Sequence, residues 1–156
     1  MSEDLIETFE DGVATLTMNR PHARNAMSGG MMSALAEAVP RLVNDPKVRL
    51  VVLTGAGGAF CAGGDVQELY QSAISTPGGP CEQGEAFFRH EYQLNYQIHT
   101  YSKPIICFGN GIVMGGGLGL MAGASHRIAT ESTRIAMPEI TIGLFPDVGG
   151  TYFLNR

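Results

Sequence analysis

The sequence predicts an α/β fold with a largely parallel sheet. Short β-branched runs alternate along the chain with longer segments whose apolar residues recur at helical spacing. Two glycine clusters, at 55–65 and 109–119, directly follow predicted strands. The 156 residues, of which 44% are hydrophobic, suffice for one domain with a hydrophobic core.

A hairpin followed by a helix is expected near the N-terminus. Segments 5–9 and 13–18 alternate apolar and polar residues on either side of Asp11-Gly12, a pair typical of tight hairpin turns. Apolar residues at helical spacing then predict a helix over 31–43. Pro40 lies inside this segment, and we expect it to kink or end the helix because proline lacks a backbone N–H.

A buried strand, a loop, a helix and a further strand are expected next. The β-branched run 50–53 is typical of a parallel strand covered on both faces. The sequence TPGG at 76–79 predicts a loop. The apolar pattern then indicates a helix over 85–101 and a strand over 104–108.

The last third of the chain is expected to begin with a small apolar helix. Glycines open the segment 115–124, which we interpret as a buried helix rather than a membrane span. Two short strands are predicted at 126–129 and 134–137. A further helix is expected to begin near Val148.

The composition argues against several classes of partner. The net charge of −5 disfavours nucleic acid and membrane surfaces, which attract a basic face. Cys61, Cys81 and Cys107 form no C-x-x-C pair, which favours a reducing compartment over a disulfide framework. The acidic N-terminus lacks the features of a secretory signal or transit peptide, so we expect a cytoplasmic protein. The histidines lack metal-site spacing, and no metal is expected.

The two glycine clusters suggest a site for an anion or a polarised oxygen. Glycine lets the backbone approach a ligand closely, and N–H groups at a helix start are free to donate. A single loop of this kind suits a phosphate, whereas two loops can direct two N–H groups at one oxygen, as in an oxyanion hole. The alternative is that the glycines serve only tight turns and close packing.

Two acids stand in the apolar stretch MPEITIGLFPDVGG at 137–150. Glu139 and Asp147 are carboxylates that would lose hydration among isoleucine, leucine and phenylalanine. Burial raises the pKa of a carboxyl group toward the range useful for proton transfer. The alternative is that both are cap or turn residues, because each follows a proline.

The chain resembles the crotonase (enoyl-CoA hydratase/isomerase) superfamily along essentially its whole length. The matching segments, in order, are RPHARNAM (20–27), VVLTGAGGAFCAGGDV (51–66), KPIICFGNGIVMGGGLGL (103–120) and MPEITIGLFPDVGGTYFL (137–154). Within the superfamily, IGLFPDVGG and FFRHEY (87–92) are most similar to the 3-hydroxyisobutyryl-CoA hydrolases. The resemblance implies the crotonase-like (ClpP/crotonase) spiral core of ββα repeats and a trimer or hexamer.

The resemblance also implies roles at the reacting end of an acyl-CoA substrate. The backbone N–H groups of Gly64 and Gly116 would hold the thioester oxygen. Glu139 matches the catalytic glutamate of the family, and Asp147 matches an acid that hydrolases carry where hydratases have glycine. Glu91 would contact the hydroxyl group of the substrate, although it also fits a solvent-facing helix acid.

At the other end of the substrate, the resemblance implies a coenzyme A site on the FCAGGD loop. The residues concerned are Ala62, Gly64, Asp65 and Val66, with Arg24 nearby for a phosphate. Two alternatives remain open: Arg24 as a solvated surface side chain, and Asp65 as the cap of a helix that begins at Val66. No cofactor is expected, because coenzyme A is part of the substrate.

One departure from the hydratase pattern bears on the reaction. Hydratases carry a second glutamate three residues after the oxyanion glycine, and this sequence has Gly119 there. We therefore expect hydrolysis of 3-hydroxyisobutyryl-CoA, as in valine degradation. The alternatives are an enoyl-CoA hydratase or isomerase, and an inactive coenzyme A-binding or scaffold protein. Hydrolases of this branch are longer, so 1–156 is expected to be an N-terminal core domain without the C-terminal helical part.

Overall fold

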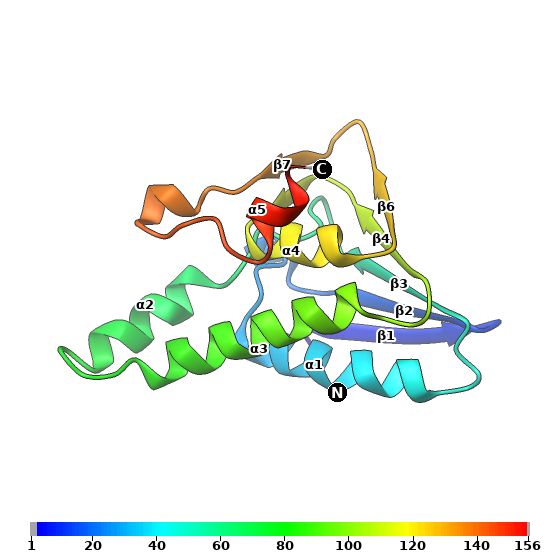
Figure 1. Ribbon diagram of the computed structural model, residues 1–156, viewed down its shortest axis with the longest axis horizontal. Helices are drawn as coiled ribbons and strands as arrows, with labels where there is room; N and C mark the ends of the chain where they lie inside the picture. The colour runs from blue at the N-terminus through cyan, green and yellow to red at the C-terminus, as the bar shows by residue number, and fades with distance from the viewer. Residues whose placement is uncertain (1–2, 156) are drawn as a thin grey trace.

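A central five-stranded sheet organises the computed structural model, which describes residues 3–155 (Figure 1). Its order is β1-β2-β3-β4-β6. The strands are β1 (Leu5–Glu10), β2 (Val13–Met18), β3 (Leu50–Gly55), β4 (Ile105–Gly109) and β6 (His126–Ala129). All but the first neighbouring pair are parallel, which confirms the predicted class.

The antiparallel pair is the predicted hairpin. Leu5 pairs with Met18 and Glu10 with Val13, and the turn between them places Asp11 and Gly12 at φ 48° and 83°. Both values lie in the left-handed region that Asp-Gly turns favour. The hairpin then continues through β2 into the parallel part of the sheet, where Met18 pairs with Gly55.

A second, two-stranded sheet lies beyond the carboxyl end of β4. It joins β5 (Ile112–Met114) to β7 (Arg134–Ala136) in parallel. The sequence predicted β7 but not β5. Three residues inside a glycine cluster are too few to show a strand period, and β5 is recognisable only through its partner.

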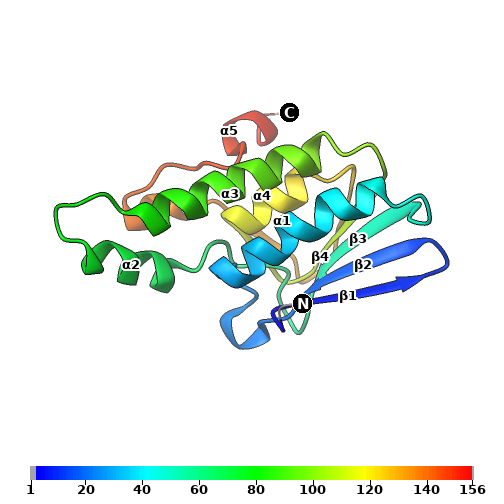
Figure 2. The same cartoon turned by 90° about the horizontal axis from the view of Figure 1, so that it is seen from below.

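Three helices cover one face of the main sheet (Figure 2). They are α1 (Gly29–Asn44), α3 (Glu82–His99) and α4 (Gly116–Gly123), while α2 (Val66–Ser75) lies beyond the carboxyl ends of β2 and β3, beside α3. The remaining helical elements are short: η1 (Pro21–Ala23), η2 (Glu139–Ile142) and α5 (Gly150–Phe153). None of the helices in residues 3–155 combines the length and apolar character that a membrane crossing requires.

Of the two expectations for Pro40, the one that it would end the helix was wrong. Helix α1 continues past this residue to Asn44. A proline inside a helix costs about 3 kcal/mol because it removes a hydrogen bond and crowds the preceding turn. Val39 and Leu42, on either side of Pro40, are buried in the core, and their burial offsets that cost.

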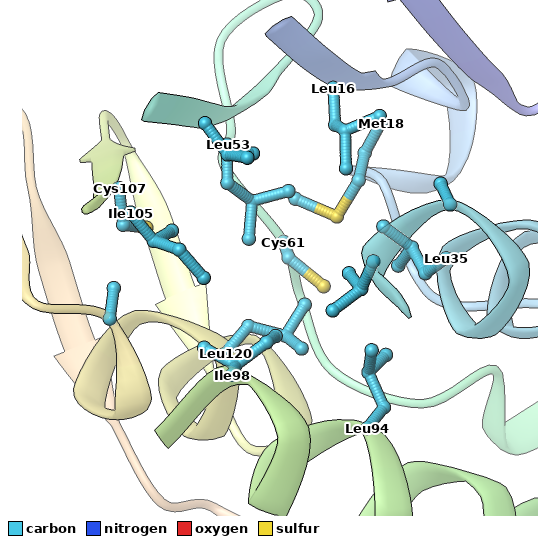
Figure 3. Packing of buried hydrophobic residues seen from close by; sticks show 14 of the residues in the cluster. Leu16, Met18, Leu35, Leu53, Cys61, Leu94, Ile98, Ile105, Cys107 and Leu120 are labelled. Atoms are coloured by element: carbon cyan, nitrogen blue, oxygen red, sulfur yellow. The ribbon is translucent and has the colours of Figure 1, made fainter. Parts of the chain in front are cut away.

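The core lies between the sheet and the three covering helices (Figure 3). The side chain of Cys61 stands at its centre and is fully buried. Around it are residues of β2 and β3 on one side and of α1, α3 and α4 on the other: Leu16, Met18, Leu53, Leu35, Leu94, Ile98 and Leu120. This packing fixes the strand ends, and with them the two glycine loops that follow β3 and β4.

Candidate active site

Five of the residues predicted to act at the reacting end line one small cavity. The cavity has a volume of about 170 Å³. Its walls include Gly64, Gly116, Glu91, Glu139 and Asp147, and Phe87 and Leu69 make part of its apolar lining. Segments far apart in the sequence therefore meet as the resemblance implied.

The first glycine loop directs a free N–H toward this cavity. Gly64 forms a parallel bridge with Met27, in which Met27 N donates to Gly63 O at 2.8 Å and Asp65 N donates to Met27 O at 2.9 Å. In such a bridge the neighbours of the central residue make the hydrogen bonds, so the N–H of Gly64 points to the opposite side. A side chain at Gly64 would also be too tight, since an added Cβ would sit 2.9 Å from Phe87 Cζ.

The second glycine loop places another free N–H beside the first. Gly116 is the first residue of α4, where a backbone N–H has no partner within the helix. Gly115 precedes it at φ 51° and ψ −125°, a conformation that requires glycine. A Cβ added at Gly63 would lie 3.4 Å from Gly116 N, so the two loops touch. Two loops in contact suit a pair of N–H groups that donate to one oxygen, aided by the α4 dipole, and the oxyanion hole stays a prediction.

Glu139 lines the same cavity and lies beside the second glycine loop. It is the first residue of η2 and is 9% exposed. A Cβ added at Gly115 would lie 2.6 Å from its Oε1, while its Oε2 is buried and has no hydrogen-bond partner among residues 3–155. Burial, and then the charge of Asp147, raise the pKa of Glu139. A carboxyl group with a raised pKa suits proton transfer, and the catalytic role of Glu139 stays a prediction.

Glu91 is also buried, at 3% exposure, on the face of α3 that meets α4. A side chain at Gly116 would collide with its Oε1, so glycine at 116 makes room for this carboxyl group. Burial, and then the charges of Asp147 and Glu139, raise the pKa of Glu91 to about 8. The alternative of a solvent-facing acid was therefore wrong.

Asp147 completes the group from the loop between η2 and α5. Its side chain is half-buried, and Tyr92 Oη donates to its Oδ2 at 2.7 Å. Sequence reasoning missed Tyr92. The residue stands inside FFRHEY, but an aromatic residue on a helix has no spacing that marks a hydrogen-bond donor.

The structure separates the predicted coenzyme A residues into two groups. Ala62 and Val66 line the cavity with Gly64. Asp65 instead caps α2, accepting from Gln67 N at 3.2 Å, and pairs with Arg20 at 3.0 Å. The capping role of Asp65 is confirmed, and its role toward coenzyme A stays a prediction.

Arg24 lies outside the cavity lining, on the loop that follows η1. Its backbone oxygen accepts from Ala62 N at 3.0 Å, which ties this loop to the glycine loop. The side chain is exposed, and no ion pair engages it among residues 3–155. A phosphate-binding role for Arg24 stays a prediction.

The described part of the chain also contains no grouping of three His, Cys, Asp or Glu side chains suited to a metal ion.

A family model described as enoyl-CoA hydratase/isomerase matches residues 13–156. The chain belongs to the enoyl-CoA hydratase/isomerase family. Members of this family that are similar to the chain include "Probable 3-hydroxyisobutyryl-CoA hydrolase 3" of Arabidopsis thaliana, 48% identical over 99% of this chain and 40% of the relative. The mitochondrial 3-hydroxyisobutyryl-CoA hydrolase of Homo sapiens is 38% identical over 99% of the chain and 39% of its own length. The chain thus spans about two fifths of these curated relatives.

Solved structures of the family confirm the crotonase-like fold. A carnitinyl-CoA dehydratase from Mycobacterium thermoresistibile superimposes with a TM-score of 0.93 at 46% identity, covering 99% of this chain and 45% of that one. An enoyl-CoA hydratase from Rhodobacter sphaeroides gives 0.92 at 41% identity, over 98% and 45%.

The hydratase position at Gly119 is closed in this member of the family. A Cβ added there would lie 2.6 Å from Val148 Cβ and 3.0 Å from Asn95 Oδ1. Val148 directly follows Asp147, so the segment that brings Asp147 to the cavity occupies the space a side chain at Gly119 would need. The presence of Asp147 and the absence of a glutamate at position 119 are therefore linked by packing.

Proposed function

We propose that this chain carries the catalytic site of a 3-hydroxyisobutyryl-CoA hydrolase, which converts its thioester substrate and water to 3-hydroxyisobutyrate and coenzyme A. The observation that carries the proposal is the convergence of Glu139 and Asp147 on two free N–H groups in one cavity. The hydrolase names of the relatives at 46–48% identity support the same reaction.

The arrangement suits chemistry at the thioester carbonyl. The N–H groups of Gly64 and Gly116 hold the carbonyl oxygen and stabilise the negative charge that develops on it. Glu139 in its ionised form removes a proton from water as the water oxygen bonds to the carbonyl carbon, or itself attacks that carbon. In either route the carbon–sulfur bond breaks and the coenzyme A thiolate takes up a proton. Where Glu139 has attacked directly, water then hydrolyses the acyl–glutamyl anhydride, which releases 3-hydroxyisobutyrate and restores the carboxylate. Asp147 assists these proton transfers from the other side.

Glu91 fits the hydroxyl group of the acyl chain. Because its pKa is about 8, the carboxyl group is mostly protonated at neutral pH and can donate a hydrogen bond to the hydroxyl oxygen. A 3-hydroxyacyl thioester would satisfy this buried donor, whereas an unsubstituted acyl chain would leave it without a partner. The carboxyl group of Glu91 thereby favours hydroxyacyl substrates.

Hydration of an enoyl thioester is the alternative reaction, supported by the names of the solved relatives. Glu139 alone would serve an isomerase. The two-glutamate route of the hydratases lacks its second acid, because Gly119 has no room for a side chain beside Val148.

Two assays on the same protein separate these reactions. A thiol-reactive dye follows coenzyme A released from 3-hydroxyisobutyryl-CoA, and the enoyl absorbance of crotonyl-CoA follows hydration. We expect thiol release and little loss of enoyl absorbance. Rapid hydration without thiol release would replace the hydrolase by a hydratase, and tight coenzyme A binding without either activity would indicate an inactive binding protein.

A cellular setting is also proposed for the protein. Cys61, Cys81 and Cys107 are free thiols, which supports a reducing compartment, and we propose the cytoplasm. Vertebrate relatives are named as mitochondrial, so fractionation of cells that express the protein is the direct test.

Acyl-CoA is the proposed partner, with no further cofactor, and a trimer or hexamer is the proposed assembly.

A further inference from the structure

Tyr92 makes a contact that packing does not explain. Its side chain is 43% exposed on α3, immediately after Glu91. Despite this exposure, its Oη lies 2.7 Å from Asp147 Oδ2. The phenol thus joins helix α3, which is anchored in the core through Leu94 and Ile98, to the loop that carries Asp147.

The loop around Asp147 has little else to hold it in place. Leu144 and Phe145 just before it are 42% and 71% exposed. Val148 just after it adopts φ 42°, a left-handed conformation that is strained for a β-branched residue. Burial of Val148 against Gly119 fixes one side of Asp147, and the phenol of Tyr92 fixes the carboxylate itself.

The same contact supplies the donor that the acidic group otherwise lacks. Among residues 3–155, no lysine, arginine or histidine forms an ion pair with Glu91, Glu139 or Asp147. Tyr92 Oη is the only side-chain donor to any of the three in that range. A hydrogen bond donated to a carboxylate stabilises its charged form. Since Oδ2 accepts this bond, Oδ1 remains available to the cavity.

We propose that Tyr92 is a positioning residue of the hydrolase site, which holds Asp147 by one oxygen so that the other is presented to the reacting thioester. This proposal rests on the proposed function. The tyrosine is not among the residues that line the cavity, and it lines two neighbouring cavities together with Asp147.

The first test is kinetic and uses a matched control. Tyr92→Phe removes one oxygen, and we expect kcat to fall about 10- to 100-fold with KM changed less than about twofold, because a misplaced catalytic group slows the reaction and leaves binding intact. Tyr96→Phe is the control. Tyr96 lies one turn further along α3, is 70% exposed, and its hydroxyl has no hydrogen bond among residues 3–155. We expect this variant to keep the wild-type kcat.

A double-mutant cycle shows whether Tyr92 acts through Asp147. In an Asp147→Asn background, Tyr92→Phe should change kcat by less than about threefold, since the carboxylate to be positioned is already gone. A full additional loss in that background would overturn the proposal. Thermal unfolding of Tyr92→Phe at the wild-type temperature would confirm that the fold is unchanged.

A second test needs no turnover. Burial, followed by the hydrogen bond to Asp147 and the charges of Asp147 and Glu91, raises the pKa of Tyr92. Other titratable groups near Tyr92 are Glu85 and Arg89 on its N-terminal side and His99 and Tyr152 on the other. With tyrosine labelled at ¹³Cζ, the Tyr92 resonance should titrate at lower pH in Asp147→Asn than in the wild-type protein.

The outcomes separate the two proposals. An unchanged Tyr92 titration in Asp147→Asn would overturn the contact and with it the positioning role. Wild-type hydrolysis with full activity in Tyr92→Phe would overturn the role and leave the function standing. A wild-type protein that releases no thiol would overturn the proposed function and the role together, whatever the titration shows.

Discussion

The two walls of the cavity are built in different ways. The glycine wall, residues 63–65 and 115–117, is held by backbone hydrogen bonds at strand ends and against the buried helix α4. The carboxylate wall, residues 139–149, consists of a short 3₁₀ helix and a loop, with Ile140 78% and Phe145 71% exposed. The glycine wall is thus tied to the core, while the carboxylate wall depends on a few specific contacts.

This difference matches the role proposed for each wall. Electrostatic stabilisation works best when donors are fixed before the reaction begins. A group that takes and returns protons must suit two charge states in turn, and a lightly packed segment tolerates that change. The predictions below test one wall at a time.

The largest effect is expected on the carboxylate wall. Glu139→Gln keeps the size of the side chain and removes its charge, so thiol release should fall about 100- to 10,000-fold. Asp147→Asn should have an effect in the same range. The double variant should be little slower than the worse single one, because residues that serve one step act as a unit. Full additivity in the thiol assay would show that the two acids act in separate steps.

The glycine wall is probed by a pair of substitutions at one position. Gly116→Pro removes the N–H, and Gly116→Ala keeps it while adding the same Cβ beside Glu91 and Met27. The collision of the added Cβ should lower kcat in both variants. The proline variant should be slower by a further 100- to 1,000-fold, roughly the contribution of one oxyanion donor. Equal kcat values in the two variants would remove Gly116 from the proposed hole.

The packing that joins the walls can be broken at Gly119. An added methyl group would meet Val148 Cβ at 2.6 Å, so Gly119→Ala should lower the free energy of unfolding by about 1–3 kcal/mol. Thiol release should fall as well, since Val148 and Asp147 would have to shift. Denaturant unfolding measures the first effect. Gly58→Ala, at a position where an added Cβ meets nothing within 4 Å, is the control and should be near neutral.

A smaller effect, on the pH dependence of the free energy of unfolding, is expected from the buried acid Glu91. The pKa of Glu91 is raised from 4.5 to about 8, so the folded protein retains a proton that the unfolded chain releases. The stabilisation from that proton is complete below about pH 4.5 and is lost as the pH rises toward 8, at no more than about 1.4 kcal/mol per pH unit. Glu91→Gln should flatten this slope in urea unfolding at about pH 5, 6 and 7. An identical slope in the variant would mean that Glu91 is ionised in the folded protein.

Much of the main sheet followed from local pattern. The hairpin, β3 and the helix opening at 115–116 were predicted because turn residues and periodicity act over a few positions. The continuation of α1 past Pro40 was not predicted, because tertiary packing overrode the local cost of the proline. The strand β5 was not predicted, because it is defined only by its pairing with β7.

The candidate site divides in the same way. Gly64, Gly116, Glu139 and Asp147 were found because they stand in motifs that resemble a family. The depth of Glu91 and the contact of Tyr92 with Asp147 depend on α3, α4 and the 139–149 segment meeting in space. No sequence window contains all three, so neither feature could be predicted from local pattern.

The buried position of Cys61 has a consequence for redox chemistry. Every turnover of the proposed reaction would release a thiol, free coenzyme A, close to the loop that begins at this cysteine. Thiol–disulfide exchange requires a thiolate that can reach the disulfide sulfur. Cys61 is 0% exposed, and burial raises its pKa to about 12, so its thiol stays protonated and out of reach. A disulfide of coenzyme A, formed from the released thiol by a separate oxidant, would therefore find no nucleophile at Cys61.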